Sequence, residues 1–82
     1  MREQKTTFFD GKITIDPDIC NGKPTLRGQR ISVETILEFL SAGESEENIL
    51  QAYPTLTKED IKTALDFATK LMAQRYSLSK IA

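Results

Sequence analysis

The spacing of apolar residues predicts short strands at the start of the chain and helices in the rest of it. In the stretch TTFFDGKITID, residues 6–16, β-type runs lie on either side of Asp10-Gly11, a dipeptide that two-residue hairpin turns favour. The stretch TLRGQRIS, residues 25–32, predicts a further short strand with a bend or bulge at Gly28. We therefore expect residues 1–31 to form short strands and turns.

From Ser32 onward the apolar positions recur at helical spacing. Ser32 is a good N-cap, and Gly43 can follow the last turn of the helix in a left-handed conformation. Between them, apolar residues fall at i, i+3, i+4 and i+7, as in a helix that buries one face. These residues are Val33, Ile36, Leu37 and Leu40.

Two more helices are predicted after Gly43. Ser45 can cap a short one that Pro54 ends. Thr57 and Asp60 then form a Thr-x-x-Asp variant of the capping box at the start of a third helix, which is expected to reach about Arg75 or beyond. The apolar face of this third helix is predicted to comprise Ile61, Ala64, Leu65, Ala68, Leu71 and Met72.

The order of these elements predicts a single, mainly α domain over residues 1–82. Residues 32–82 are expected to form a three-helix bundle with a C-terminal tail. A helix, a tight turn, a short helix, a turn and a longer helix is the layout of a helix-turn-helix domain, of the homeodomain-like or winged-helix-like kind. The fold class expected is thus a helix-turn-helix-like domain with a short N-terminal β element.

The amino-acid composition argues against several classes of function. No apolar run approaches the roughly 20 residues that span a bilayer, so we expect a cytoplasmic protein with no membrane association. The chain has no histidine, and Cys20 is its single cysteine, which removes the usual general base, a disulfide framework and a zinc cluster. We therefore predict no catalytic residues, no metal or other cofactor and no small-molecule substrate; the protein is expected not to be an enzyme.

Charge is segregated along the chain. Residues 1–31 carry six basic and four acidic side chains, and residues 57–82 carry five basic and three acidic ones. Residues 32–56 carry five acids and no Lys or Arg. A phosphate backbone would be repelled by this middle segment and could be met only by the two outer ones.

The basic residues of the segment GKPTLRGQR, residues 22–30, have three alternative roles. They can bind operator DNA, with Arg side chains on phosphates and the third helix near the groove. An Arg can instead pair with Glu34 or Glu38 and hold the backbone in shape. The segment can also face a protein partner, such as a second copy across a two-fold axis. The candidate DNA contacts are Lys23, Arg27, Lys58, Lys62 and Thr63; Gly22, Pro24, Gly28 and Arg30 are assigned a structural role, with Arg30 anchoring the first helix.

The segment GKPTLRGQRISV, residues 22–33, resembles the signature of a bacterial and archaeal family catalogued as domain of unknown function 433 (DUF433), described as antitoxin-like, of the VapB kind. Further on, the chain also matches the family pattern at Ala42-Gly43 and in the stretch from Tyr53 to Ile61. The similarity covers roughly residues 13–72. Gln29 and Asn21 depart from it, where the family usually has Thr and often has Gly.

This resemblance implies a helix-turn-helix-like fold and a role as the antitoxin of a type II toxin-antitoxin system. Such a protein would act as a dimeric, DNA-binding autorepressor and would neutralise a PIN-type ribonuclease toxin. Arg75 or Lys80 in the tail could then enter the acidic metal site of the toxin, unless the tail is only the end of the helix docked on the core. The alternative function is a protein-interaction module without DNA affinity, whose acidic central helices face a basic partner.

Overall fold

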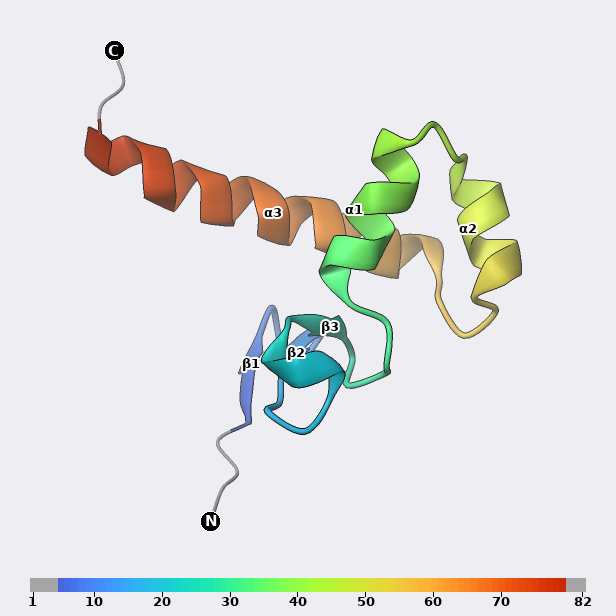
Figure 1. Cartoon of the computed structure of the whole chain (residues 1–82), viewed down its shortest axis with the longest axis horizontal. Coiled ribbons are helices and arrows are strands. Elements are labelled where there is room, and N and C mark those ends of the chain that lie inside the picture. The colour runs from blue at the N-terminus through green and yellow to red at the C-terminus, as the bar shows by residue number, and fades with distance from the viewer. Residues whose placement is uncertain (1–4, 80–82) are drawn as a thin grey trace.

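The computed structural model describes the backbone of residues 5–79 and the side chains of residues 5–74. It contains a small three-stranded antiparallel sheet and three helices (Figure 1). In chain order the elements are β1 (Thr6–Phe8), β2 (Ile13–Ile15), a single 3-10 turn η1 (Cys20–Gly22), β3 (Thr25–Leu26), α1 (Val33–Ser41), α2 (Glu46–Ala52) and α3 (Lys58–Ser79). The predicted order of a β element followed by three helices is confirmed.

The sheet has the strand order β1-β2-β3. Phe8 pairs with Ile13 across the first hairpin, so four residues form its loop rather than the two expected from Asp10-Gly11. Phe9, Asp10 and Gly11 all have positive φ in this loop, at 53°, 57° and 84°. Ile13 pairs in turn with Leu26 of β3, and both side chains are fully buried.

The helix ends follow their sequence signals closely. The Ser32 hydroxyl accepts a hydrogen bond from the Thr35 N–H at 3.1 Å, and the Ser45 hydroxyl accepts one from the Asn48 N–H at 3.1 Å. These bonds satisfy backbone donors that have no partner within the first turn of a helix. Both predicted caps are present.

The start of α3 is a reciprocal capping box. The Asp60 N–H donates to Thr57 Oγ1 at 3.2 Å, while the Thr57 N–H donates to Asp60 Oδ2 at 3.0 Å. Aspartate therefore replaces the usual glutamate or glutamine in this motif, as the Thr-x-x-Asp spacing predicts.

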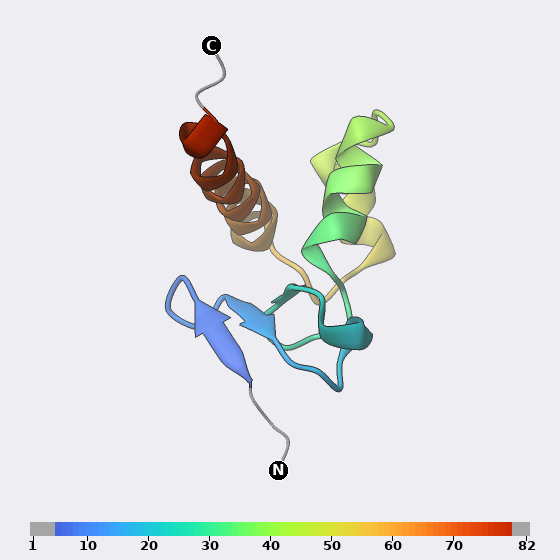
Figure 2. The same cartoon turned by 60° about the vertical axis from the view of Figure 1, so that its left-hand side comes forward.

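The core lies where the sheet, α1, α2 and the first half of α3 meet. Its buried apolar residues are Ile13, Leu26, Val33, Ile36, Ile49, Leu56, Ile61 and Ala64. Both α1 and α3 rise from the sheet and diverge, and the second half of α3 extends beyond the other elements (Figures 1 and 2). The second half of α3 is therefore left without a covering element among the described residues.

The predicted apolar face of α3 is buried only in part. Ile61 and Ala64 are fully buried, but Leu65, Leu71 and Met72 are 44%, 47% and 52% exposed. The helical period is correct, but burial does not continue along the whole predicted face: Leu65 is already exposed beside the buried Ala64, although Phe67 beyond it still packs against the core.

Candidate functional site

The segment from Gly22 to Ser32 forms a tight double turn around β3. Gly22 has φ +79°, and Pro24 accepts a hydrogen bond from the N–H of Val33 at 2.9 Å, which ties the segment to the start of α1. After β3 the chain reverses in a turn closed by the Gln29 N–H donating to the Leu26 carbonyl at 3.0 Å. Gly28, with φ +73°, occupies a left-handed position in this turn, which explains the predicted bend.

Arg27 occupies the other left-handed position of the same turn, with φ +53°. A side chain rarely adopts this conformation, so something must hold it there. The holding contacts are with the start of α3: Arg27 Nε donates to Asp60 Oδ1 at 2.9 Å, and Nη2 donates to Asp60 Oδ2 at 2.7 Å. Nη2 also donates to the Thr55 carbonyl at 2.8 Å. Arg27 was predicted to contact DNA or a partner; the structure instead places its guanidinium in an internal ion pair.

The Arg27–Asp60 pair perturbs both groups. The Arg27 guanidinium hydrogen-bonds the carboxylate and holds the pKa of Asp60 below its usual value, with further lowering from the bonds to Thr57. The same hydrogen bond raises the pKa of Arg27. The Asp60 side chain is 4% exposed and the Arg27 side chain 42%, so the pair has a buried anion and a half-exposed cation. Its contacts are those of a structural clamp.

Lys23 makes the contact with α1 that the sequence predicted for Arg30. Lys23 Nζ donates to Glu34 Oε1 at 2.9 Å, and this hydrogen bond raises the pKa of Lys23. Arg30 is exposed and makes no ion pair among residues 5–74. The expectation that Arg30 anchors α1 is therefore wrong; the ion pair with the first turn of α1 is made by Lys23.

Of the candidate contacts on α3, Lys58 and Lys62 lie one helical turn apart on the same side, and Thr63 does not share that surface. Thr63 is 4% exposed, so its predicted surface position is wrong. Lys62 is exposed but donates to Asp66 Oδ2 at 3.1 Å, one helical turn on. Lys58 is exposed and makes no ion pair within the described part of the chain. The Arg75 side chain and all of Lys80 lie outside the described residues.

The most distinctive surface of the described chain is apolar and lies on the middle of α3. We name it the α3 ridge and define it by Leu65, Phe67, Ala68, Leu71 and Met72. The residues at positions 65, 68 and 72 form one row along the helix, and those at 67 and 71 form a neighbouring row, because residues three or four positions apart adjoin on a helix surface. Apolar side chains with this exposure on neighbouring turns form a patch of the kind that marks interaction sites.

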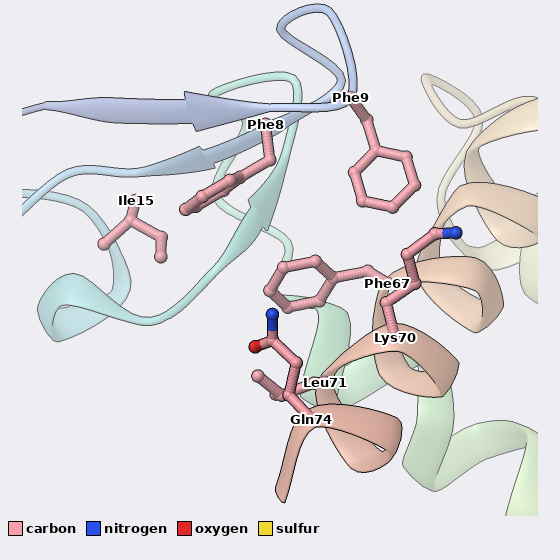
Figure 3. Close-up of a pocket in the computed structure, with 7 residues that line it drawn as sticks. All are labelled: Phe8, Phe9, Ile15, Phe67, Lys70, Leu71 and Gln74. Atoms are coloured by element: carbon pink, nitrogen blue, oxygen red, sulfur yellow. The ribbon is translucent and has the colours of Figure 1, made fainter. Parts of the chain in front are cut away.

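A hollow flanks the α3 ridge on each side, and Phe67 and Leu71 line both. The sheet hollow, of about 330 Å³, lies between α3 and the first hairpin (Figure 3). It is lined by Phe8, Phe9, Ile15, Phe67, Lys70, Leu71 and Gln74. The helix hollow, of about 200 Å³, lies between α3 and α1. It is lined by Pro24, Val33, Glu34, Leu37, Phe67, Ala68 and Leu71.

Phe67 connects α3 to the first hairpin. Its ring centroid lies 6.0 Å from that of Phe8 and 6.2 Å from that of Phe9, the latter in an edge-to-face arrangement. These separations are typical of favourable aromatic pairs. The rings point toward one another across the sheet hollow, and Lys70 turns its ammonium group away from it (Figure 3). The hollow is thus apolar inside and charged only at its rim.

The size of the hollows indicates which ligands they suit. Small-molecule sites usually enclose roughly 300–1,000 Å³ and surround most of the ligand. The helix hollow is smaller than this and the sheet hollow is at the lower limit. Side chains of a docking protein are better matched to such spaces than a free ligand is.

Residues 5–79 contain no helix with the length and apolarity needed to cross a bilayer. Among the described side chains, no three His, Cys, Asp or Glu residues are grouped as a metal site requires.

Sequence comparison relates the chain to longer proteins. It is 39% identical over 56 residues to the uncharacterized protein y4eO of Sinorhizobium fredii, covering 68% of this chain and 25% of that one. It is 33% identical over 64 residues to the uncharacterized protein Rv2308 of Mycobacterium tuberculosis, covering 78% of this chain and 26% of that one. The chain therefore spans about a quarter of the length of these curated relatives.

Structural and family comparisons agree with one another. The crystal structure at 2.00 Å of a DUF433 member protein from Anabaena variabilis superposes with a TM-score of 0.72 at 31% identity, covering 78% of this chain and 63% of that one. The model of the family described as protein of unknown function (DUF433) matches residues 13–68, which include the Arg27–Asp60 clamp and the first part of the α3 ridge. The chain belongs to the DUF433 family.

Proposed function

We propose that this domain is a protein-interaction module that docks its partner on the α3 ridge and the two hollows beside it. The observation that carries the proposal is the exposure of large apolar side chains along one helix: Leu65, Leu71 and Met72 are 44–52% exposed. Phe8, 41% exposed, extends this apolar surface across the sheet hollow. Covering such side chains stabilises an association by about 25 cal/mol for each Å² of apolar surface removed from water.

The distribution of charge supports protein binding over DNA binding. Three of the five candidate DNA contacts, Lys23, Arg27 and Lys62, are paired with carboxylates inside the domain. Thr63 is buried, and Lys58 is followed directly by Glu59 on α3. A DNA-binding surface needs cations that are free to neutralise phosphates, and these side chains neutralise acids of the protein instead.

An antitoxin is one specific form of such a module, because it inhibits its toxin by direct contact. In this form of the proposal the α3 ridge binds a PIN-type ribonuclease encoded beside this protein. The order of three helices is the layout that supports an additional helix-turn-helix role at operator DNA, with Lys58 as the remaining candidate contact. The docking surface is the same whether or not DNA is also bound.

Two binding measurements on the purified chain test the proposal. The first follows self-association and binding to the purified product of the adjacent gene, for the wild type, Leu71→Glu and the control Ala73→Glu. Ala73 is exposed on α3, lies outside both hollows and is not three or four positions from any residue of the α3 ridge. We expect Leu71→Glu to abolish association and Ala73→Glu to preserve it. The proposal fails if both variants behave as the wild type in both assays.

The second measurement titrates DNA from upstream of the gene at two salt concentrations, with a scrambled duplex as the control. We expect no binding above the scrambled duplex. Specific, salt-sensitive binding that falls in Lys58→Ala and survives in Leu71→Glu would instead assign the domain to DNA.

A further inference from the structure

The helix hollow lies between two helices and is lined mostly by apolar side chains. It is bounded by α1 on one side and α3 on the other, and these helices diverge away from the sheet (Figure 2). Leu37 and Leu71 line the two sides, and Pro24 also contributes to the lining. Amphipathic helices bind in grooves of this kind by inserting apolar side chains that recur at i, i+3, i+4 and i+7.

Charge around this groove specifies what kind of helix fits. Residues 32–56, which contain α1 and α2, carry five acids and no Lys or Arg. On α1, Glu34 lies at the groove and is paired with Lys23, whereas Glu38 is exposed and makes no ion pair among residues 5–74. The fitting helix is therefore apolar on one side and basic beside it.

The chain itself contains a helical segment of this description. Among the side chains that the structure describes, residues 67–74 of α3 include Lys70 and no acid. Lys70, within this segment, is exposed beside the α3 ridge and forms no ion pair in the described part of the chain. The second half of α3 also projects from its own domain, so it is free to enter another one (Figure 1).

We propose that the α3 ridge of one copy docks in the helix hollow of a second copy, about a two-fold axis, with Lys70 of each copy beside Glu38 of the other. This inference rests on the proposed function and names its partner. A two-fold arrangement uses the same surface twice, so one contact covers both projecting helices and fills both helix hollows. It also brings the basic half of α3 to the acidic α1, which a single copy does not achieve because the two helices diverge.

A charge exchange tests the arrangement. Sedimentation equilibrium of the full chain is measured for the wild type, Glu38→Lys, Lys70→Glu and the double variant, with Ala73→Glu as the control. We expect a dimer that each single reversal weakens by about tenfold or more, since both symmetry-related pairs become repulsive. The double variant restores opposite charges across the interface and should recover dimerisation, and the control should match the wild type.

A cross-linking experiment tests the contact between copies directly. Leu37→Cys and Leu71→Cys are made separately in a Cys20→Ser background, and the two proteins are mixed under mild oxidation. We expect a disulfide between unlike chains, formed faster than between Leu37→Cys and the control Ala73→Cys. Equal rates for both mixtures would overturn the proposed docking geometry.

The two assays separate this inference from the proposed function. A wild-type protein that stays monomeric at millimolar concentration would overturn the inference. If it also bound the adjacent gene product through Leu71, the proposed function would stand with a foreign partner. If Leu71→Glu changed neither self-association nor that binding, the proposed function would fail as well.

Discussion

Arg27 and Asp60 lie 33 positions apart in the chain and are joined by two hydrogen bonds of 2.9 and 2.7 Å. The contact connects the turn after β3 to the first turn of α3, and it is made by an arginine whose backbone is in a left-handed conformation. Asp60 also closes the capping box with Thr57, so one carboxylate both starts the helix and fixes it to the sheet. This pair therefore fixes the start of α3 against the turn that follows β3.

Replacing Arg27 should destabilise the fold. We expect Arg27→Ala to lower the free energy of unfolding by about 2 kcal/mol, below the usual cost of breaking a fully buried pair because the arginine is half-exposed. Arg27→Lys should recover little, since an ammonium cannot reproduce the paired bonds to Asp60 and the bond to Thr55. Urea unfolding measures both. The control Lys62→Ala, which removes an exposed pair, should change stability little; a loss as large as that of Arg27→Ala would contradict the clamp.

We expect Asp60 to make the free energy of unfolding decrease as the pH falls. Its pKa in the folded state is held below 3.8, so its contribution is complete above the unfolded pKa of about 4 and is lost as the pH falls through the folded value. We therefore expect the wild type to lose stability below about pH 4 more steeply than Asp60→Asn, which cannot titrate at this position. Urea unfolding between pH 2 and about pH 7 checks this. Parallel curves for the two proteins would show that Asp60 titrates normally in the fold.

Sequence patterns predicted the local features of this fold because each depends on neighbouring residues. Ser32 and Ser45 cap the N–H groups three positions away, and Gly43 ends α1 with φ +94°. Residue type and spacing define such motifs completely. The elements were therefore predicted correctly, with small errors such as the length of the first hairpin loop.

The same patterns could not predict where the side chains of residues 22–30 point. Arg27 turns inward because the turn places it at a left-handed position, and nothing in the segment itself distinguishes it from Arg30. Asp60, its partner, was identified only as a helix cap. The α3 ridge was missed for a related reason: Leu65 and Leu71 have the spacing of core residues, and only the three-dimensional arrangement shows that both are exposed while Phe67 between them packs against the core.

Substitutions at Gly43 test whether the end of α1 requires a residue that adopts the left-handed conformation easily. It follows α1 in a Schellman arrangement, with the Glu44 N–H donating to the Phe39 carbonyl and its own N–H donating to the Leu40 carbonyl, both at 3.0 Å. A Cβ at this position would meet no atom within 4 Å, so the cost of Gly43→Ala comes from the backbone alone. We expect a loss of about 1 kcal/mol in the free energy of unfolding.

Gly43→Asn provides the matched control for that change. Asparagine tolerates the left-handed conformation better than alanine does, so it should be less destabilising in the same urea unfolding measurement. Equal losses for Ala and Asn would mean that the conformation of Gly43 is not what limits the substitution.

Phe67 should tie the first hairpin to α3. Removing its ring in Phe67→Ala eliminates the contacts with Phe8 and Phe9 and merges the sheet hollow with the helix hollow. We expect a loss of about 2 kcal/mol, less than for a fully buried ring because Phe67 is half-buried.

The loss in Phe67→Ala should also be local. Amide hydrogen exchange of β1 and β2 should rise more than that of α1 and α2, because the hairpin loses its contact with α3 while the core around Ile36 and Ile61 keeps its own packing. Leu71→Ala is the control, since Leu71 lines both hollows but has no ring contact with the hairpin. A uniform rise in exchange across the chain, or an equal effect of Leu71→Ala, would show that the hairpin is held by the sheet and core alone.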